Sequence, residues 1–158
     1  MIANELKKHT VCFTGHRELS HEDIRSQLDK LIERLIKRRY THYRLGGALG
    51  FDTESALAVL RAKEKHLHIK LILILPYPEQ AKNWKKEQQA LYERIRERAD
   101  EVIYTGEKYT RGCFHVRNRA LVDGSSLCVA YLVKNEGGSA YTMWYAEQKR
   151  LKVINIAQ

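Results

Sequence analysis

Three glycine-bearing turns in this sequence carry the residue types that bind anions. The turns are Thr14–Arg17 (TGHR), Gly46–Asp52 (GGALGFD) and Glu136–Thr142 (EGGSAYT), and each lies between an apolar run and an amphipathic run. Small residues at a strand-to-helix turn let backbone N–H groups approach a ligand, and the N-terminus of a helix favours negative charge. Because such turns open at one edge of a parallel sheet, together they predict one pocket for a phosphorylated compound.

Basic side chains accompany these turns. Arg17 can bind a phosphate through the two arms of its guanidinium group, and His16 can donate a hydrogen bond to one. Arg117, Asn118 and Arg119 lie in a stretch without acidic residues and suit phosphate and ribose recognition. Each motif also has a structural alternative, which is a surface arginine paired with a neighbouring helix or a solvated basic turn.

The Gly46–Asp52 turn matches neither of the common phosphate-binding fingerprints. It follows the second apolar run rather than the first, unlike a G-x-G-x-x-G turn, and it lacks the Gly-Lys-Ser/Thr of a P-loop. Asp52 has two roles open to it, accepting a hydrogen bond from a ribose hydroxyl or capping the next helix, and capping is the favoured one. His115 is expected to be packed or exposed rather than catalytic.

The third turn is a candidate anion-binding nest. Gly137, Gly138 and Ser139 open the last expected helix with unpaired N–H groups, and the hydroxyls of Ser139 and Thr142 are close in sequence. The alternative is a tight turn in which Ser139 caps the helix. The two roles are compatible.

Composition and charge describe an ordinary globular chain of 158 residues, long enough for one domain with a core. The net charge of +9 admits nucleic acid as a partner, but much of the excess lies on helix-like stretches, so nucleic acid is the less favoured partner. No apolar run approaches the roughly 20 residues of a membrane span, and residues 1–10 lack the apolar core of a signal peptide. The three scattered cysteines, Cys12, Cys113 and Cys128, predict buried thiols in a cytoplasmic protein, and no Cys/His spacing predicts a metal site.

The apolar runs predict six strands separated by helices. Strands are expected at 10–14, 42–45, 69–75, 101–104, 127–133 and 153–156, with 69–75 in a central position. Helices are expected at 24–36, from 52 through 60, and at 81–99, 116–123 and 141–149, and Ser20 with Asp23 predicts a capping box at the first of them. The alternation of strands and helices predicts an α/β fold with a mostly parallel sheet.

The order of the motifs resembles that of a known family. The sequences TGHR, GGALGFD, RNRALVD and GGSAYT occur here in the order seen in YpsA-type proteins of the SLOG superfamily, which joins the Smf/DprA proteins and the LOG phosphoribohydrolases. The resemblance covers nearly the whole chain, and RNRALVDGSSLCVAY is also similar to a segment of DprA proteins. It implies a Rossmann-like three-layer αβα sandwich with about six strands, formed by residues 1–158 as a single domain.

The resemblance also implies a function. It is the binding of a nucleotide-like small molecule, such as NAD, ADP-ribose or AMP, at the strand-end loops of a cytoplasmic homodimer. The ligand residues implied by position are Gly15, His16, Arg17, Gly46, Gly47, Gly50, Asp52, Arg117, Asn118, Arg119, Gly137, Gly138, Ser139 and Thr142.

One departure from the related enzymes bears on catalysis. LOG enzymes carry a PGGxGTxxE motif whose glutamate assists N-glycosidic cleavage, and aligning its glycine pair on Gly137 and Gly138 puts Trp144 at that glutamate. Since an indole cannot handle a proton as a carboxylate does, ligand binding or sensing is favoured over hydrolysis. Two alternatives stay open: a LOG-type nucleotide N-glycosidase that recruits Asp52 or Glu54, and DprA-like binding of single-stranded nucleic acid. Aromatic side chains available for base stacking in the second alternative are Tyr77, Trp84, Tyr104 and Tyr109.

Overall fold

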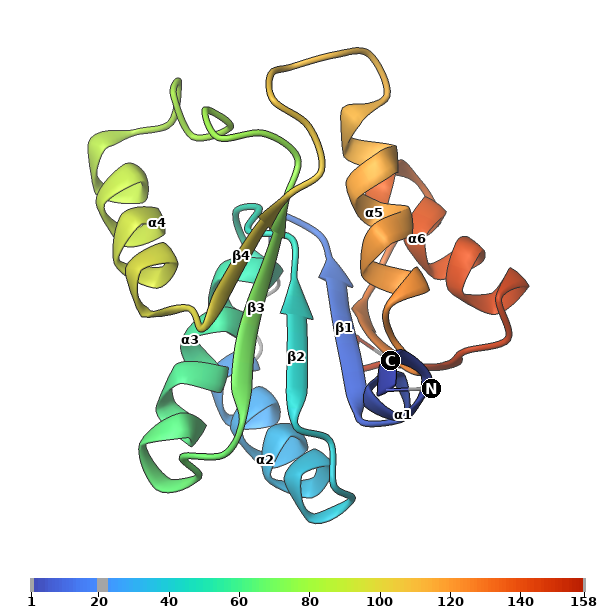
Figure 1. Ribbon diagram of the computed structural model, residues 1–158. Coiled ribbons are helices and arrows are strands. Elements are labelled where there is room, and N and C mark those ends of the chain that lie inside the picture. The colour runs from blue at the N-terminus through green and yellow to red at the C-terminus, as the bar shows by residue number, and fades with distance from the viewer. Residues whose placement is uncertain (1, 20–22, 158) are drawn as a thin grey trace.

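The computed structural model describes residues 2–19 and 23–157, which form one six-stranded sheet with helices on both faces (Figure 1). The strands are β1 (Thr10–Gly15), β2 (His42–Leu45), β3 (Lys70–Leu75), β4 (Glu101–Tyr104), β5 (Leu127–Tyr131) and β6 (Lys152–Asn155). The helices are α1 (Ile2–Lys8), α2 (Ile24–Lys37), α3 (Phe51–Lys65), α4 (Lys86–Arg98), α5 (Cys113–Asp123) and α6 (Gly137–Gln148). The predicted Rossmann-like α/β fold is confirmed.

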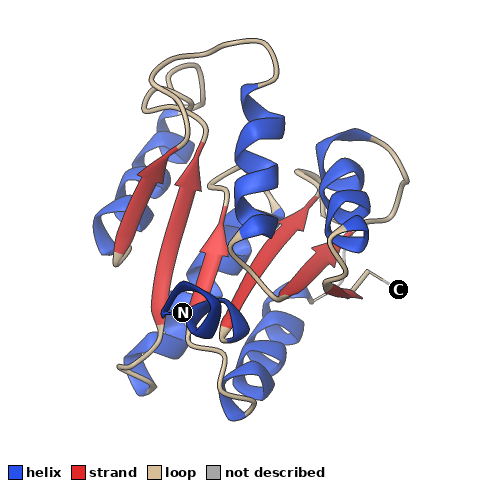
Figure 2. Cartoon of the chain, turned by 45° about the vertical axis from the view of Figure 1, so that its right-hand side comes forward, coloured by secondary structure: helices blue, strands red, loops and turns tan. Residues whose placement is uncertain are grey.

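All neighbouring strands are parallel, in the order β4-β3-β2-β1-β5-β6, and Figure 2 shows their arrowheads pointing toward one end of the molecule. From β1 the chain proceeds outward through β2 and β3 to β4, and it then returns through α5 to β5 on the other side of β1. The strand order therefore reverses between β1 and β5. Ligands of open α/β sheets bind in the crevice at such a point, outside the carboxyl ends of the strands.

Alternating side chains of the strands divide the core between two layers of helices. Val11 and Phe13 of β1 belong to the larger cluster, which includes buried residues of α2, α3 and α4. Cys12, between them in the sequence, belongs to the smaller cluster with residues of α5 and α6. The thiols of Cys12, Cys113 and Cys128 are buried, as predicted.

The predicted boundaries of several elements are wrong. α4 begins at Lys86 rather than Ala81, because residues 78–83 form turns and the Gln88 side chain accepts a hydrogen bond from the Lys85 N–H at the start of the helix. α5 begins at Cys113 and α6 at Gly137, three and four residues before the predicted starts at 116 and 141. The residues 2–8 form a helix that the sequence did not predict.

The apolar run of β3 is second from the edge of the sheet and not at its centre, but it pairs with a strand on each side, β2 and β4. The predicted cap Ser20 lies outside the described residues. At the start of α2, Asp23 Oδ1 accepts a hydrogen bond from the Ser26 N–H at 3.1 Å.

Candidate functional site

A polar cleft lies at the carboxyl end of β1, where the strand order reverses. Its volume is about 460 Å³, within the range of small-molecule sites. Its walls come from the end of β1, from the turns that follow β1 and β2, from the β3–α4 connection and from the first turns of α5 and α6. The lining residues are Thr14, Gly15, His16, Arg17, Ala48, Asp52, Gln80, Gly112, Phe114, His115, Arg117, Asn118, Leu121, Glu136, Gly137, Gly138 and Ser139.

The helices α5 and α6, whose N-cap residues Gly112 and Glu136 line the polar cleft, lack side-chain caps. α5 follows Gly112, which has no side chain, and α6 follows Glu136, whose side chain makes no capping hydrogen bond. α2 and α4 begin outside the polar cleft, and the side chains of Asp23 and Gln88 bond backbone N–H groups at their starts. Uncapped first-turn N–H groups, together with the positive end of the helix dipole, favour an anion in the cleft.

Arg117 brings a buried positive charge to the cleft. The residue is 6% exposed, its Nη1 donates to the Gly46 carbonyl, and its Nε donates to Asn118 Oδ1 at 2.8 Å. Burial lowers the pKa of the guanidinium group, and the nearby Asp52 opposes this shift. Within the described residues no salt bridge reaches Arg117. A buried cation without an ion-pair partner is costly, so an anionic ligand would compensate this charge.

Asp52 is a buried carboxylate at the same cleft. Its Oδ2 accepts a hydrogen bond from the Ala48 N–H at 3.1 Å, and its Oδ1 has no hydrogen-bond partner. Burial raises the pKa of Asp52 to about 6, and the positive charge of Arg117 opposes the increase. The predicted capping role is wrong, because Gly50 is the N-cap of α3 and Asp52, already inside the helix, bonds the preceding turn instead.

The turn after β1 is held by contacts with two other loops. His16 Nε2 accepts hydrogen bonds from the backbone N–H groups of Val133 and Lys134, at 3.0 and 3.2 Å, so we assign the ring proton to Nδ1. Gly50 has a φ of +82° and lies against the backbone of Arg17, where a Cβ atom would overlap the carbonyl group. The turn thus depends on His16 on one side and on the absence of a side chain at residue 50 on the other.

An apolar pocket of about 360 Å³ adjoins the polar cleft. It lies between α3, α4 and the turn after β1. The residues that line it are Arg17, Leu19, Gly47, Leu49, Gly50, Asp52, Thr53, Glu54, Ala56, Leu73, Trp84, Gln88, Leu91, Tyr92 and Ile95. Arg17 and Asp52 line both cavities, so they stand at the border between them.

Most of the predicted site residues lie at these two cavities. Those that line the polar cleft are Gly15, His16, Arg17, Asp52, Arg117, Asn118, Gly137, Gly138 and Ser139, whereas Gly47 and Gly50 line the apolar pocket. Gly46, Arg119 and Thr142 line neither. Gly46 accepts from Arg117, Arg119 Nη1 donates to the Tyr141 hydroxyl at 3.1 Å, and Thr142 Oγ1 donates to the Gly138 carbonyl at 2.9 Å within α6. Ligand binding by each of these residues stays a prediction.

Several lining residues were not predicted from the sequence. Gln80 follows β3, so the rule that strand-end loops form the site could have identified it. Phe114 and His115 line the cleft because α5 begins three residues before its predicted start. Trp84 and Tyr92, whose ring centroids are 5.2 Å apart, line the apolar pocket. Their place there could not be predicted without knowing how α4 packs on α3.

Among residues 2–19 and 23–157, no group of three or more His, Cys, Asp or Glu side chains is arranged to hold a metal ion. Over the same residues, no helix has the length and apolar character needed to cross a membrane.

Comparison with known proteins identifies relatives of this chain. A family model described as the YspA SLOG family matches residues 6–156. The SPbeta prophage-derived protein YoqJ of Bacillus subtilis is 32% identical over 141 residues, which cover 81% of this chain and 82% of YoqJ. The UPF0398 protein YpsA of Bacillus subtilis is 31% identical over 109 residues, which cover 67% of this chain and 61% of YpsA.

Two solved structures of DNA processing protein A (DprA) share the fold. The alignment with DprA from Streptococcus pneumoniae has a TM-score of 0.68 and 21% identity, and that with DprA from Helicobacter pylori has 0.69 and 18%. The two alignments cover 94% and 95% of this chain, but this chain spans only 50% and 66% of the two DprA chains. The Helicobacter pylori protein binds single-stranded DNA. At this level of identity the likeness shows the fold alone.

Proposed function

The chain belongs to the YspA SLOG family, and on this premise we propose that it binds a nucleotide-derived ligand of the NAD, ADP-ribose or nucleoside phosphate class in the polar cleft. The phosphate would lie against the turn after β1 and the first turn of α6. Arg117 would neutralise its charge, and Asp52 would accept a hydrogen bond from a ribose hydroxyl through its free Oδ1. The single-domain organisation, the homodimer and the cytoplasmic location implied by the resemblance stay predictions.

The buried guanidinium group of Arg117 is the observation that carries this proposal. A cation that is 6% exposed, and whose nearby carboxylate Asp52 forms no salt bridge with it, would be stabilised by a phosphate beside it. The uncapped starts of α5 and α6 at the same cleft support the same ligand chemistry.

Isothermal titration with AMP, ADP-ribose and NAD tests the proposal. At least one should bind, and Arg117→Gln should weaken that binding at least tenfold, because it removes a charge-assisted contact in a dry site. Arg17→Gln changes an exposed residue at the cleft and gives a second test if Arg117→Gln fails to fold. Arg98→Gln, an exposed residue at the end of α4, is the matched control and should bind as the wild type does.

Samples from the same titrations can be analysed to distinguish ligand binding from ligand hydrolysis. Trp144, which replaces the LOG glutamate, is 54% exposed and does not line the cleft, so it supports a binding role. The carboxylates that do line the cleft are those of Asp52 and Glu136. Chromatography of the AMP and NAD samples should detect no free base. Release of base that Asp52→Asn abolishes would establish the N-glycosidase alternative instead.

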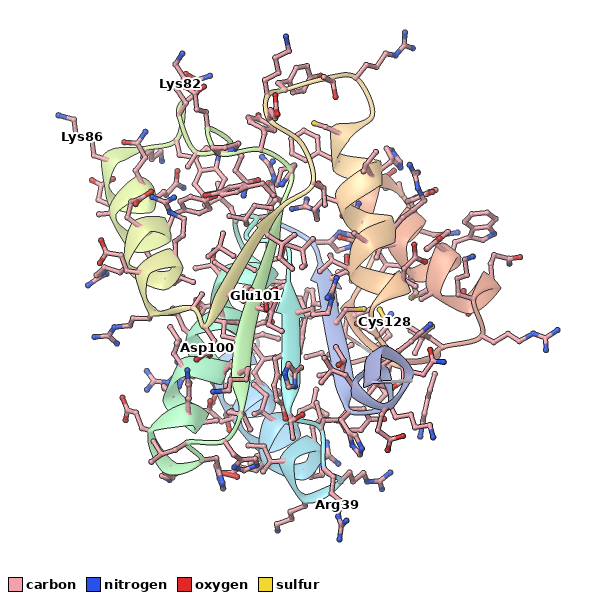
Figure 3. All side chains as sticks on the ribbon, in the orientation of Figure 1. Arg39, Lys82, Lys86, Asp100, Glu101 and Cys128 are labelled. Atoms are coloured by element: carbon pink, nitrogen blue, oxygen red, sulfur yellow. The ribbon has the colours of Figure 1, made fainter. Side chains whose placement is uncertain are left out.

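A specific set of side chains favours single-stranded nucleic acid as a second candidate ligand. The rings of Tyr77, Tyr109 and Phe114 lie with centroids 6.0–6.3 Å apart at the edge of the polar cleft, where bases could stack. Lys82 and Lys86 lie at this same end of the molecule, opposite the end that carries Arg39 (Figure 3). The likeness to DprA supports this candidate as well.

Fluorescence anisotropy with a labelled oligothymidylate tests the second candidate. If the candidate is right, affinity falls steeply with salt concentration, because binding releases counterions, and Tyr109→Ala weakens it at least fivefold. Leu67→Ala removes an exposed apolar side chain that precedes β3, at the other end of the sheet, and is the control. A salt-independent signal, or equal affinity for both variants, would exclude this candidate.

A further inference from the structure

We propose that the apolar pocket binds the nucleobase of the same ligand whose phosphate binds in the polar cleft. This inference rests on the proposed function and adds a specificity site to it. The two cavities would then form one bipartite site, with the ribose at their border.

The walls of the apolar pocket suit a planar ring. Leu19, Leu49, Leu91 and Ile95 contribute aliphatic surface, and the indole of Trp84 packs edge-to-face on Tyr92 with an interplanar angle of 77°. Aromatic and aliphatic walls of this kind stabilise a flat ring through its faces and edges. The volume of about 360 Å³ lies at the lower end of the range for small-molecule sites.

The few polar groups of the apolar pocket can recognise the edge of a base. Thr53, Glu54 and Gln88 line it. Thr53 Oγ1 already donates to the Ala48 carbonyl and Gln88 Oε1 already accepts from the Lys85 N–H, so a base edge would meet the hydroxyl as an acceptor, the Glu54 carboxylate and the Gln88 NH₂ group. Gln80 holds the aromatic wall in place, since its Nε2 donates to the Tyr92 hydroxyl and to the Gly47 carbonyl, both at 3.3 Å. An apolar pocket with a small number of oriented polar groups is typical of a site that selects one ring system.

The border between the cavities explains how one ligand could occupy both. Arg17 and Asp52 line the polar cleft on one side and the apolar pocket on the other. A nucleoside phosphate has the same order of parts, a charged phosphate, a polar ribose and a flat base. Asp52 Oδ1 is a buried oxygen without a hydrogen-bond partner at this border, and a ribose hydroxyl that reaches it would supply the missing donor.

Tryptophan fluorescence can test this placement, because the chain has two tryptophans, at 84 and 144. Trp144 is 54% exposed and lines neither cavity, so Trp144→Phe leaves Trp84 as the sole reporter at the apolar pocket. In this variant, AMP should quench the emission excited at 295 nm, and ribose 5-phosphate, which lacks a base, should not. Trp84→Phe is the matched control, in which neither compound should change the emission.

Calorimetry of the same two compounds gives an independent measure. AMP should bind the wild type at least tenfold more tightly than ribose 5-phosphate does, and Leu91→Gln should remove most of that difference without weakening ribose 5-phosphate. Arg94→Gln, on an exposed position of the same helix, should leave both affinities unchanged. Equal affinities for the two compounds, with no change at Trp84, would overturn the base site while leaving the proposed function intact. Binding of neither compound would overturn the base site, and the proposed function would fall with it if ADP-ribose and NAD also failed to bind.

Discussion

The buried carboxylate of Asp52 should make the stability of this protein depend on pH. Its pKa is raised from 3.8 to about 6 in the folded protein, so between these values the folded chain holds more protons than the unfolded one. The free energy of unfolding therefore falls as the pH rises from about 4 to about 6. Above pH 6 the fold is therefore less stable than below pH 4 by about 3 kcal/mol, because the pKa rises by about two units on folding and each unit corresponds to about 1.4 kcal/mol.

Asp52→Asn should remove this dependence. The amide oxygen can still accept from the Ala48 N–H, so at pH 7 we expect a gain of about 1–3 kcal/mol, reduced because Arg117 loses a neighbouring negative charge. Urea denaturation between pH 4.5 and 7.5 measures it. Asp29→Asn alters a partly exposed carboxylate on α2 and should keep the wild-type slope. A slope that persists in Asp52→Asn would show that another group is responsible.

Gly50 and Gly112 both have a positive φ but differ in ψ, which is −119° at Gly50 and 0° at Gly112, and they differ in their surroundings. Their φ values are +82° and +83°, yet a Cβ atom at Gly50 would overlap the Arg17 carbonyl, whereas one at Gly112 would have no heavy atom within 4 Å. Gly112→Ala should cost about 1–2 kcal/mol from the left-handed conformation alone. Gly50→Ala should cost at least about 2 kcal/mol more, because a Cβ atom there overlaps Arg17 and because its ψ of −119° lies outside the left-handed helical region. Equal losses in chemical denaturation would contradict both the close approach of the two turns and this backbone conformation.

At the scale of elements, the sequence predicted strands better than helix starts. Apolar runs mark all six strands to within two residues at each end, because a buried parallel strand needs apolar side chains on both faces. The start of α5 was missed because Gly112 was assigned to a loop, and that of α6 because Gly137 and Gly138 were assigned to the turn that opens the helix. The apolar stripe of Trp84, Leu91 and Ile95 was recognised, but Trp84 precedes α4, and its place at a pocket depends on tertiary packing.

The link between the turn after β1 and the loop after β5 depends on one side chain. His16→Ala removes the acceptor of the Val133 and Lys134 N–H groups, each worth about 1 kcal/mol. Hydrogen exchange of these two amides should speed up on the order of tenfold, while global stability changes by less than about 1.5 kcal/mol, because the opening is local. His68→Ala, at an exposed residue before β3, is the control. Unchanged exchange at both amides would argue against the link.

At the scale of the molecule, topology explains why residues far apart in sequence share a site. The turns after β1 and β2 and the start of α6 were predicted to meet, because parallel strands end at one edge of the sheet. The division into a polar cleft and an apolar pocket was not predictable in this way. It arises because α5 and α6 cover one face of the sheet while α3 and α4 cover the other, and sequence periodicity does not assign helices to faces.

The two helix layers meet on a shared sheet, so we expect residues 1–158 to unfold as a single cooperative unit, as a single domain would. The tryptophans report the layers separately, since Trp84 packs against the cluster on the α3–α4 face and Trp144 lies on α6. Urea unfolding is followed in Trp144→Phe and in Trp84→Phe. Within each variant, the transition seen by fluorescence should have the same slope and midpoint as the transition seen by far-ultraviolet circular dichroism. Distinct fluorescence and dichroism midpoints within one variant would mean that the layers unfold separately, and the single-domain prediction would then be wrong.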